Sequence, residues 1–355
     1  MSTAAGAPLR LSAGQIASFE RDGFVNGGAV LDASAVAELS AELDRVLELG
    51  PEYYQGQLYR PALFHNAAAE GTDPMWQIVN MWAVSEAFRR LAYNPALTSM
   101  VAQLRASAAG LPDPGNTAPA DSARGAGEGG GHGTRGDDSI VLFHDQIQYK
   151  PPNGGGATTW HQDSTLDWQR WDEAWVCTAW LALDDVDADS GAMWMVPGSH
   201  LWGDACVNPP FLTSPPVSAS TNLDDVQPVV SEAAAAAVAN DGRFATRGTE
   251  AMNVLPLVRP VRAGEVHFHH GLSWHHSPVN TSNRRRRALA LHYVSGDTPF
   301  EAPGGHILFT ELGGEQTERT MASAGLHFPV VWRQRRPAPM PAAAPPFPPG
   351  VLARL

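Results

Sequence analysis

The sequence of 355 residues has one lysine, two cysteines and no long apolar run. The two cysteines, Cys177 and Cys206, cannot build the disulfide framework of a small secreted domain. Because no stretch of about 18 apolar residues occurs and the N-terminus lacks a hydrophobic signal core, we expect neither a membrane-spanning helix nor secretion. The formal charge of −13 argues against nucleic acid and anionic membranes as the main partners, since both bind basic surfaces.

A small-molecule substrate is therefore the expected partner. The oligomeric state stays open, with a monomer as the simplest expectation. A cytoplasmic location follows from the same absences. The alternative is a peroxisomal location, because Ala353, Arg354 and Leu355 at the end of the sequence loosely resemble the peroxisomal signal Ser-Lys-Leu.

Helical and extended patterns occupy different parts of the chain. Residues 11–22 predict a short helix, followed by a turn at Asp22-Gly23 and a strand at Phe24. Residues 32–49 have apolar side chains at helical spacing behind a cap at Asp32 or Ser34, and residues 85–104 predict a third helical stretch. Strand candidates follow in "IVLFHDQIQYK", "WVCTAWLAL", "GAMWMVP", "AGEVHFHH" and "ALALHYVS". Helices followed by many strands predict a mainly β domain with flanking helices, such as a jelly roll.

We expect one domain overall, with two segments of biased composition. Residues 1–109 are predicted to form helical support and the first strands, and residues 139–336 the jelly-roll core. Between them, residues 110–138 are rich in Gly, Pro and Asp and too poor in apolar residues to pack, which predicts a disordered insertion. Residues 337–355 form a proline-rich tail.

The segment "IVLFHDQIQYK" carries polar side chains at alternate positions, namely His144, Gln146, Gln148 and Lys150. Such a face is either exposed to solvent or turned into a ligand cavity. Lys150 favours the cavity, because it is the only lysine and the solvated faces elsewhere use Arg, Glu and Asp.

The stretch "WHQDS" is a candidate metal motif. Residues i and i+2 of an extended chain project to the same side, so His161 and Asp163 can bind one ion. An imidazole nitrogen with a carboxylate oxygen suits Fe(II) better than Mg²⁺ or Ca²⁺. The motif is common without a metal, so it needs a third ligand elsewhere in the chain.

The histidine-rich stretch "GEVHFHHGLSWHHSPVN" is the source of that third ligand. It contains five histidines, His267, His269, His270, His275 and His276, which cannot all bind one ion. His267 and His269 at i and i+2 raise an alternative metal site of the cupin type, although no glutamate follows at a useful spacing.

The run "RRRR", residues 284–287, is either a solvated basic turn or the start of a ligand-binding strand. In the strand that follows, Arg286 shares a face with two alanines and His292, whereas Arg287 shares the other face with leucines and a tyrosine. The first face leaves room for a carboxylate beneath the guanidinium, whose fork it fits. Two histidines and one carboxylate leave three positions of an octahedral iron open. A 2-oxo acid can chelate two and dioxygen the third, so Arg286 would hold the far carboxylate of 2-oxoglutarate.

Four blocks of the sequence, taken in order, are similar to one known family. They are "LSAGQIASFERDGFV…LDASAVAELSAELDRVL", "KPPNGGG…WHQD", "WVCTAWLALDDVDADSGAMWMVPGSH" and "AGEVHFHHGLSWHHSPVNTSNRRRRALALHYV". Together they resemble the phytanoyl-CoA dioxygenase family of Fe(II)/2-oxoglutarate oxygenases. The ordered set is specific, although no single block is. The resemblance implies a double-stranded β-helix of the jelly-roll, cupin-like type.

The resemblance also implies roles for individual residues. His161, Asp163 and His275 correspond to the iron ligands, with Ser277, Asn280 and Arg286 in the family's register after His275, so that His276 is a bystander. Residues implied to contact 2-oxoglutarate are Gln146, Lys150, Gln162, Trp180, Ser277 and Arg286. The implied cofactors are Fe(II), 2-oxoglutarate and dioxygen.

The reaction implied is hydroxylation, or another oxidation, of a substrate C–H bond with release of succinate and CO2. Related iron halogenases lack the carboxylate ligand, so Asp163 favours oxidation over halogenation. A small, partly apolar substrate is expected, with Trp160, Trp168, Trp171 and Trp175 either as an apolar wall or as core, and with Gln77 and Asn80 at the pocket mouth. An acyl-CoA is not expected, because few basic residues could bind its phosphates. The alternatives are a non-catalytic relative that binds a metal or small molecule, and a zinc hydrolase, which has no need for Arg286.

Overall fold

The computed structural model describes residues 9–68, 70–111, 113–114, 139–164, 175–202, 256–300, 308, 319–323, 327–333 and 336–344. The helices are α1 (Ala13–Asp22), α2 (Ala33–Tyr54), α3 (Met81–Val84), α4 (Glu86–Ala92) and α5 (Pro95–Ala108), with 3-10 turns at Ser199–Trp202 and Met321–Ser323. The strands are β1 (Phe24–Ala29), β2 (Leu63–Asn66), β3 (Trp76–Val79), β4 (Ile140–Lys150), β5 (Thr158–His161), β6 (Val176–Ala182), β7 (Met193–Met195), β8 (Leu257–Arg259), β9 (Glu265–His270), β10 (His275–Ser277), β11 (Arg286–Ser295), β12 (Pro299–Phe300), β13 (Arg319–Thr320), β14 (Val330–Arg333) and β15 (Arg336–Pro337).

The N-terminal helices begin at side-chain caps, as the sequence predicts. Ser12 and Gln15 form a capping box at α1, which ends at Gly23 in the left-handed conformation with φ of 82°. Asp32, and not Ser34, caps α2 by accepting from the N–H of Ala35.

The third helical stretch expected over residues 85–104 is two helices, α4 and α5. The side chain of Asn94 accepts from the N–H groups of Ala96 and Leu97, and Pro95 occupies the first turn of α5. A proline in a helix interior would lose one backbone hydrogen bond and clash with the preceding turn, so the chain ends one helix and starts another here.

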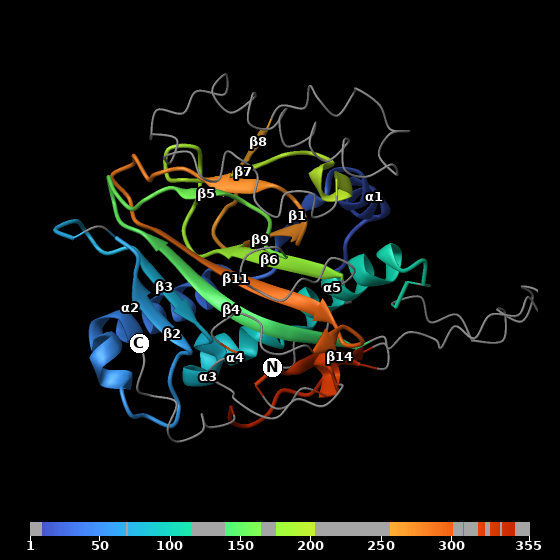
Figure 1. The fold of residues 1–355 in the computed structure, drawn as a ribbon, viewed down its shortest axis with the longest axis horizontal. Coiled ribbons are helices and arrows are strands. Elements are labelled where there is room, and N and C mark those ends of the chain that lie inside the picture. The colour runs from blue at the N-terminus through green and yellow to red at the C-terminus, as the bar shows by residue number, and fades with distance from the viewer. Residues whose placement is uncertain are drawn as a thin grey trace, which may run out of the picture.

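Two antiparallel sheets form the rest of the fold, and the expected jelly roll is confirmed (Figure 1). The larger sheet has nine strands, with the order β1-β9-β6-β11-β4-β14-β15 and with β3 and β2 added beside β4. The smaller sheet has the order β5-β10-β7-β8 and lies above the larger one in Figure 1. A further pair is formed by β12 and β13.

The larger sheet has a helix side and an inner side that faces the smaller sheet. Helices α2 to α5 lie on the helix side in Figure 1, where side chains such as Leu43, Phe88 and Leu289 belong to one large buried cluster. The inner side contributes Trp180 and Ala290 to a second, smaller cluster, together with Met193 of β7. Polar side chains of the inner side form the candidate site.

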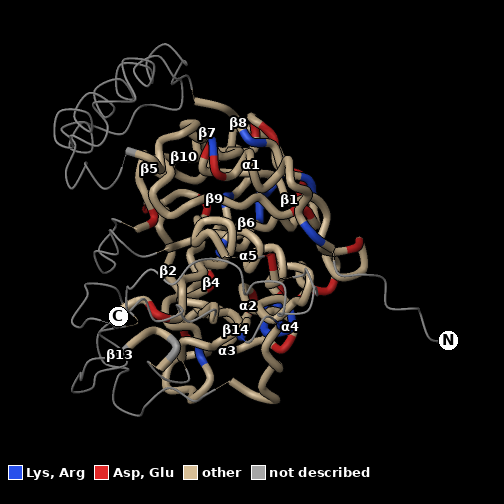
Figure 2. The backbone as a smooth tube through the Cα atoms, turned by 90° about the vertical axis from the view of Figure 1, so that its right-hand side faces the viewer, with Lys and Arg blue, Asp and Glu red and all other residues tan. Residues whose placement is uncertain are grey.

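Charged residues of both signs are interspersed along the backbone in the view of Figure 2, and those described on this side form no continuous basic stripe. None of the described helices is long and apolar enough to cross a lipid bilayer.

Several sequence expectations concern residues outside those described. They include most of the expected insertion at 110–138, the C-terminal tripeptide 353–355, Cys206, Trp168 and Trp171. The start of the proline-rich tail is described: Pro337 lies in β15, and Ala338 donates to the carbonyl of Val331 at 2.8 Å.

Candidate active site

His161, Asp163 and His275 come together between the two sheets, although more than 100 residues separate the first from the last. His161 ends β5 and His275 begins the neighbouring β10, where the two are paired across the strands with ring centroids 4.1 Å apart. Asp163 follows two residues after His161, and its Oδ1 lies 3.5 Å from His161 Nε2 and 3.6 Å from His275 Nε2. The three potential ligand atoms lie within 4.8 Å of one another. Among the described residues, this is the group of His, Cys, Asp and Glu side chains arranged to bind a metal.

Both histidines direct the same ring nitrogen toward the shared space. His161 Nδ1 donates to the carbonyl of Thr159 at 2.8 Å, and His275 Nδ1 donates to the carbonyl of Ser273 at 2.9 Å. A hydrogen bond at Nδ1 fixes the tautomer and leaves the Nε2 lone pair for a metal. Burial lowers the pKa of His275 well below its usual value, and the adjacent His161 lowers it further. His275 is therefore neutral, the form that binds a metal.

The cupin-type alternative at His267 and His269 is not assembled. His267 is buried and stacks on Phe24 with ring centroids 5.8 Å apart, and neither of its ring nitrogens has a hydrogen-bond partner among the described residues. His269 instead points to Asp163, with its Nε2 3.0 Å from Oδ2. In the described part of the chain, no carboxylate lies where it could bind one metal ion together with both His267 and His269.

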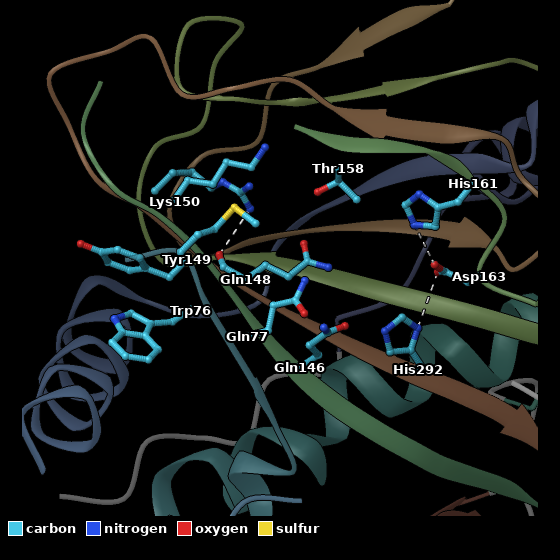
Figure 3. Close-up of a pocket in the computed structure, with 12 residues that line it drawn as sticks. Trp76, Gln77, Gln146, Gln148, Tyr149, Lys150, Thr158, His161, Asp163 and His292 are labelled. Atoms are coloured by element: carbon cyan, nitrogen blue, oxygen red, sulfur yellow. Dashed lines mark hydrogen bonds and ion pairs between the residues drawn. The ribbon is translucent and has the colours of Figure 1, made fainter. Parts of the chain in front are cut away.

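A second group, of two buried cations, lines the same pocket, and Figure 3 shows its member Lys150 at the end away from His161 and Asp163. Arg286 and Lys150 are each 2% exposed and pair across β11 and β4. The guanidinium of Arg286 reaches only neutral acceptors, the carbonyl of Gln148 and the hydroxyl of Ser277, each at 3.4 Å, while its Nε has no partner among the described residues. Lys150 Nζ donates to the carbonyl of Ser277 at 3.0 Å and to that of Pro278.

The electrostatics of these two cations point to an anion. Burial lowers the pKa of Arg286 to about 10, although Asp184 acts in the opposite direction. Burial, together with the charge of Arg286, lowers the pKa of Lys150 well below its usual value. A buried charge is stable when an opposite charge pairs with it, and the described residues supply none to either side chain. This end of the pocket therefore suits a carboxylate ligand.

The remaining residues expected around 2-oxoglutarate form two groups: Gln146, Trp180 and Ser277 lie at the site, whereas Gln162 does not. Gln146 lines the pocket, and Trp180 Nε1 donates to Gln148 Oε1 at 3.0 Å while the guanidinium of Arg286 lies over its ring. Ser277 Oγ is fixed by donating to the carbonyl of Gly191 at 2.9 Å. Gln162 departs from the expectation.

The side chain of Gln162 is buried and donates to the carbonyl of Leu272 at 2.6 Å, and it lines neither pocket around the histidines. The residue lies between two neighbours that project to one side of the chain, so its own side chain projects to the other. The structure therefore does not bring Gln162 to the site. Asn280 is also structural, because its amide donates to the carbonyls of Pro151 and Arg284.

The pocket between the two ends is a cavity of about 120 Å³. Figure 3 shows the three glutamines Gln77, Gln146 and Gln148 between the Lys150 end and the His161–Asp163 end. Gln77 thus lines the pocket, as expected. Asn80 does not lie at the pocket mouth: it is completely buried, with φ of 66°, and its N–H donates to the carbonyl of Asp145 where α3 begins.

The described tryptophans near the motif are mainly packing residues. Trp175 belongs to the large core cluster, and Trp160 packs on His276 with ring centroids 5.0 Å apart. The apolar wall that is described comes instead from Met75 and Trp76.

Three further side chains lie near Asp163: Thr178, His269 and His292. From the sequence, His269 was considered only for the cupin-type alternative, and the other two were given no role. His292 shares the parity of Arg286 on β11, so the strand pattern contained a signal for it. Thr178 had none, because a threonine in an apolar strand is ordinary.

Comparison with known proteins places this arrangement in a family context. The family model described as phytanoyl-CoA dioxygenase (PhyH) matches residues 19–288. A phytanoyl-CoA dioxygenase domain-containing protein 1 from Danio rerio is 27% identical over 173 residues, which cover 48% of this chain and 50% of that protein. The homologue from Caenorhabditis elegans is 29% identical over 147 residues, covering 41% of this chain and 43% of that protein. The chain thus spans about half the length of the curated relatives it matches.

Solved structures share the fold at low sequence identity. The non-haem alpha-ketoglutarate-dependent epimerase SnoN from nogalamycin biosynthesis is 23% identical, with a TM-score of 0.55 over 90% of this chain and 97% of that chain. The carbocyclase SnoK from the same biosynthesis is 20% identical, with a TM-score of 0.55 over 92% of this chain and all of that chain. These likenesses confirm the fold. Because the family model covers most of the sequence, including both strands of the metal candidates and Arg286, the chain belongs to the phytanoyl-CoA dioxygenase family.

Proposed function

We propose that this protein is an Fe(II)- and 2-oxoglutarate-dependent dioxygenase that hydroxylates, or otherwise oxidises, a C–H bond of a small organic substrate. The observation that carries the proposal is the combination of two groups in one pocket. Asp163 Oδ1 faces the Nε2 atoms of His161 and His275 at one end. The buried guanidinium of Arg286, which has no carboxylate partner among the described residues, lies at the other.

The first group fits iron by the chemistry of its atoms. Two neutral imidazole nitrogens and one carboxylate oxygen form the facial set that binds non-haem Fe(II) and leaves three coordination positions open. The bonds from each histidine Nδ1 to a backbone carbonyl keep Nε2 directed at the metal. His161, Asp163 and His275 would hold the ion.

The second group fits the distal carboxylate of 2-oxoglutarate. Arg286 supplies a planar fork for two carboxylate oxygens, and the hydroxyl of Ser277 lies 3.4 Å from one of its nitrogens. Lys150 supplies a second positive charge close by. Binding an anion here would return to both cations the stabilisation they lose by burial.

When bound, iron and 2-oxoglutarate would supply the electrons that reduce dioxygen, coupled to decarboxylation of the keto acid to succinate and CO2. This chain's residues provide placement and exclusion of water. Arg286 orients the cosubstrate, and the glutamine amides of Gln77 and Gln146 lie where they can hydrogen-bond a substrate in the same pocket. Asp163 would occupy the position that is free for a halide in halogenases, which lack this carboxylate, and this favours hydroxylation over halogenation.

The substrate is proposed to be small and partly apolar, because Met75 and Trp76 line the pocket beside those amides. An acyl-CoA is disfavoured by the partners of the arginine run. Arg284 pairs with Asp187 and Arg285 with Asp44, while Arg287 pairs with Asp184. These cations are therefore neutralised locally and do not offer a free basic surface to phosphates.

Succinate release tests the proposal without knowledge of the substrate. The purified protein, supplied with Fe(II), 2-oxoglutarate and air, should release succinate slowly, and omission of iron should stop the release. Under anaerobic conditions, Fe(II) and 2-oxoglutarate should give the weak visible charge-transfer band of a chelated keto acid. A metal-binding scaffold without turnover would give neither signal, and a zinc hydrolase would not depend on 2-oxoglutarate. A metabolite screen for stimulated succinate release would then identify the substrate.

A further inference from the structure

The two carboxylate oxygens of Asp163 have different surroundings. Oδ1 faces the Nε2 atoms of His161 and His275. Oδ2 points away from them and accepts from the hydroxyl of Thr178 at 2.6 Å and from His269 Nε2 at 3.0 Å. Asp163 is buried, at 4% exposed. Its two oxygens are therefore held in different roles.

The donors to Oδ2 belong to a polar row across the larger sheet. His269 on β9 pairs with Thr178 on β6, which pairs with His292 on β11. All three side chains are at most 3% exposed, and the row continues on β4, where His144 pairs with His292. His292 Nδ1 lies 2.9 Å from Thr178 Oγ1. Three strands of fixed register thus place this row directly behind the carboxylate.

The direction of each hydrogen bond follows from the number of protons. An ionised carboxylate only accepts, so both Thr178 Oγ1 and His269 Nε2 donate to it. A hydroxyl has one proton, so Thr178 accepts from His292 Nδ1 while it donates to Asp163. A carboxylate that binds a metal is ionised, so this chain of donors is consistent.

We propose that Thr178 and His269 are positioning residues which hold Oδ2 of Asp163, so that the carboxylate binds the metal through Oδ1 alone. The inference rests on the proposed function. A carboxylate that bound through both oxygens would occupy one of the three open iron positions, and the keto acid and dioxygen need all three. A carboxylate with a free Oδ2 could also rotate, which would weaken the directed set of three ligands.

Two pairs of substitutions test the proposal. Thr178→Val keeps the shape of the side chain without its hydroxyl, and Thr178→Ser restores the hydroxyl. His269→Leu removes the N–H donor, and His269→Gln keeps one. His270→Gln is the matched control, because His270 is the next residue on β9, packs against Phe19 and His200, accepts from the N–H of Leu272, and takes no part in the row.

Two measurements test the positioning role, and neither of them is the catalytic activity of the iron-loaded enzyme. Direct anaerobic titration should show Fe(II) binding about 10–100-fold weaker in Thr178→Val and His269→Leu, the usual effect of losing a partner of a metal ligand. The charge-transfer band of the anaerobic Fe(II)–2-oxoglutarate complex should shift or weaken in the same two variants. Thr178→Ser and His269→Gln should recover much of both signals, and His270→Gln should match the wild type.

The proposal is overturned if Thr178→Val and His269→Leu bind Fe(II) with wild-type affinity and an unchanged band, even if their melting temperatures fall. That result would make the row a stabilising feature of the core only. If His269→Leu does not fold, the Thr178→Val and Thr178→Ser pair decides alone. The titration needs no 2-oxoglutarate, so a wild-type protein that binds Fe(II) but gives no band would count against the proposed function and not against the positioning role. A wild-type protein that binds no Fe(II) would overturn both.

Discussion

The two faces of strand β11 contain residues of the same type in opposite situations. Arg286 and Arg287 are neighbours in the sequence, and both are buried, at 2% and 6% exposed. Arg287 lies on the helix side of the sheet, where it forms a two-point ion pair with Asp184 and a second contact with Asp44. Arg286 lies on the inner side and finds only neutral acceptors among the described residues.

The difference shows that the partners of a buried charge, and not its burial, distinguish structure from function. A guanidinium with its carboxylates in place completes the fold. One that lacks them while lining a cavity destabilises the empty protein and favours an anionic ligand. The adjacent histidines of β10 also differ in their partners. His275 Nε2 faces Asp163, whereas His276 donates through Nδ1 to the carbonyl of Thr158 and packs on Trp160.

The largest expected effect comes from removing the anionic metal ligand on the inner side. Asp163→Ala should abolish 2-oxoglutarate-dependent succinate release and weaken Fe(II) binding, because the only carboxylate of the three-ligand set is lost. Chloride should bind in the vacated position. Wild-type succinate production by this variant would show that the ligand assignment is wrong.

The adjacent histidines of β10 give the next sharpest contrast. His275→Ala should lose Fe(II) binding and succinate release, whereas His276→Ala should retain both, with at most a changed substrate preference. The measurements are the iron content of the purified variants and their succinate release. The reverse outcome would move the third ligand by one residue and undo its register with Arg286.

For the two arginines, we expect different effects: substitution of Arg286 should weaken 2-oxoglutarate binding, whereas substitution of Arg287 should lower stability. Arg286→Ala should weaken 2-oxoglutarate binding by roughly 30- to several-thousand-fold, the equivalent of ~2–5 kcal/mol for a truncated buried charge pair. The apparent KM for 2-oxoglutarate should rise while Fe(II) binding stays near normal. Arg286→Lys should rescue this only in part, since lysine supplies the charge without the fork.

Arg287→Ala is the matched control on the other face. It should leave the KM for 2-oxoglutarate little changed but lower the free energy of unfolding by roughly 1.5–3 kcal/mol, because charged hydrogen bonds to Asp184 are lost. Arg285→Ala should have little kinetic effect, since its partner Asp44 is exposed. If all three alanine variants changed the KM alike, the two faces would not be functionally distinct.

The last prediction concerns stability alone and the residue Asp145, a polar side chain that β4 turns to the helix side. It is fully buried, accepts from the N–H groups of Met81 at 2.6 Å and Trp82 at 2.9 Å, and burial raises its pKa to about 7. Because the folded pKa lies above the unfolded one, the folded state holds a proton that the unfolded state has released. Stability is therefore lost as pH rises from about 4 to about 7.

Between pH 5 and 7, this contribution amounts to about 2 kcal/mol, at about 1.4 kcal/mol per unit. Urea unfolding of the metal-free protein should show it as a difference between the wild type and Asp145→Asn that changes with pH. In the variant, which cannot titrate, the free energy of unfolding should fall less over this range. Parallel pH profiles would mean that Asp145 does not titrate there.

Much of the fold could be predicted from local patterns. Caps at Ser12 and Asp32, the glycine turn at Gly23 and strand alternation in β4 and β11 depend on neighbours in sequence, so their signals are visible in the chain itself. The break between α4 and α5 was missed because apolar spacing continues across Pro95. Asn80 was misplaced because a buried, left-handed asparagine leaves no mark in the local pattern.

Within the site, the sequence indicated the residue types and the strand parity that selects Arg286. It did not separate the five histidines of residues 267–276 by their own pattern, and the choice of His275 came from resemblance to a family. The structure pairs His275 with His161 across β10 and β5, and it turns Gln162 away to Leu272. Those outcomes depend on which strands become neighbours.

The sequence by itself determined the long helices and strands, the alternation of their faces and the kinds of side chain available for iron and a carboxylate. These properties follow from the geometry of a single strand or helix, in which spacing along the chain fixes direction. Only the tertiary structure decided which atoms meet: Asp163 Oδ1 with two histidines, Asp163 Oδ2 with Thr178 and His269, and Arg286 with no carboxylate at all among the described residues. Several of these contacts join residues more than 100 positions apart, and they depend on which distant strands become neighbours, which no local pattern shows.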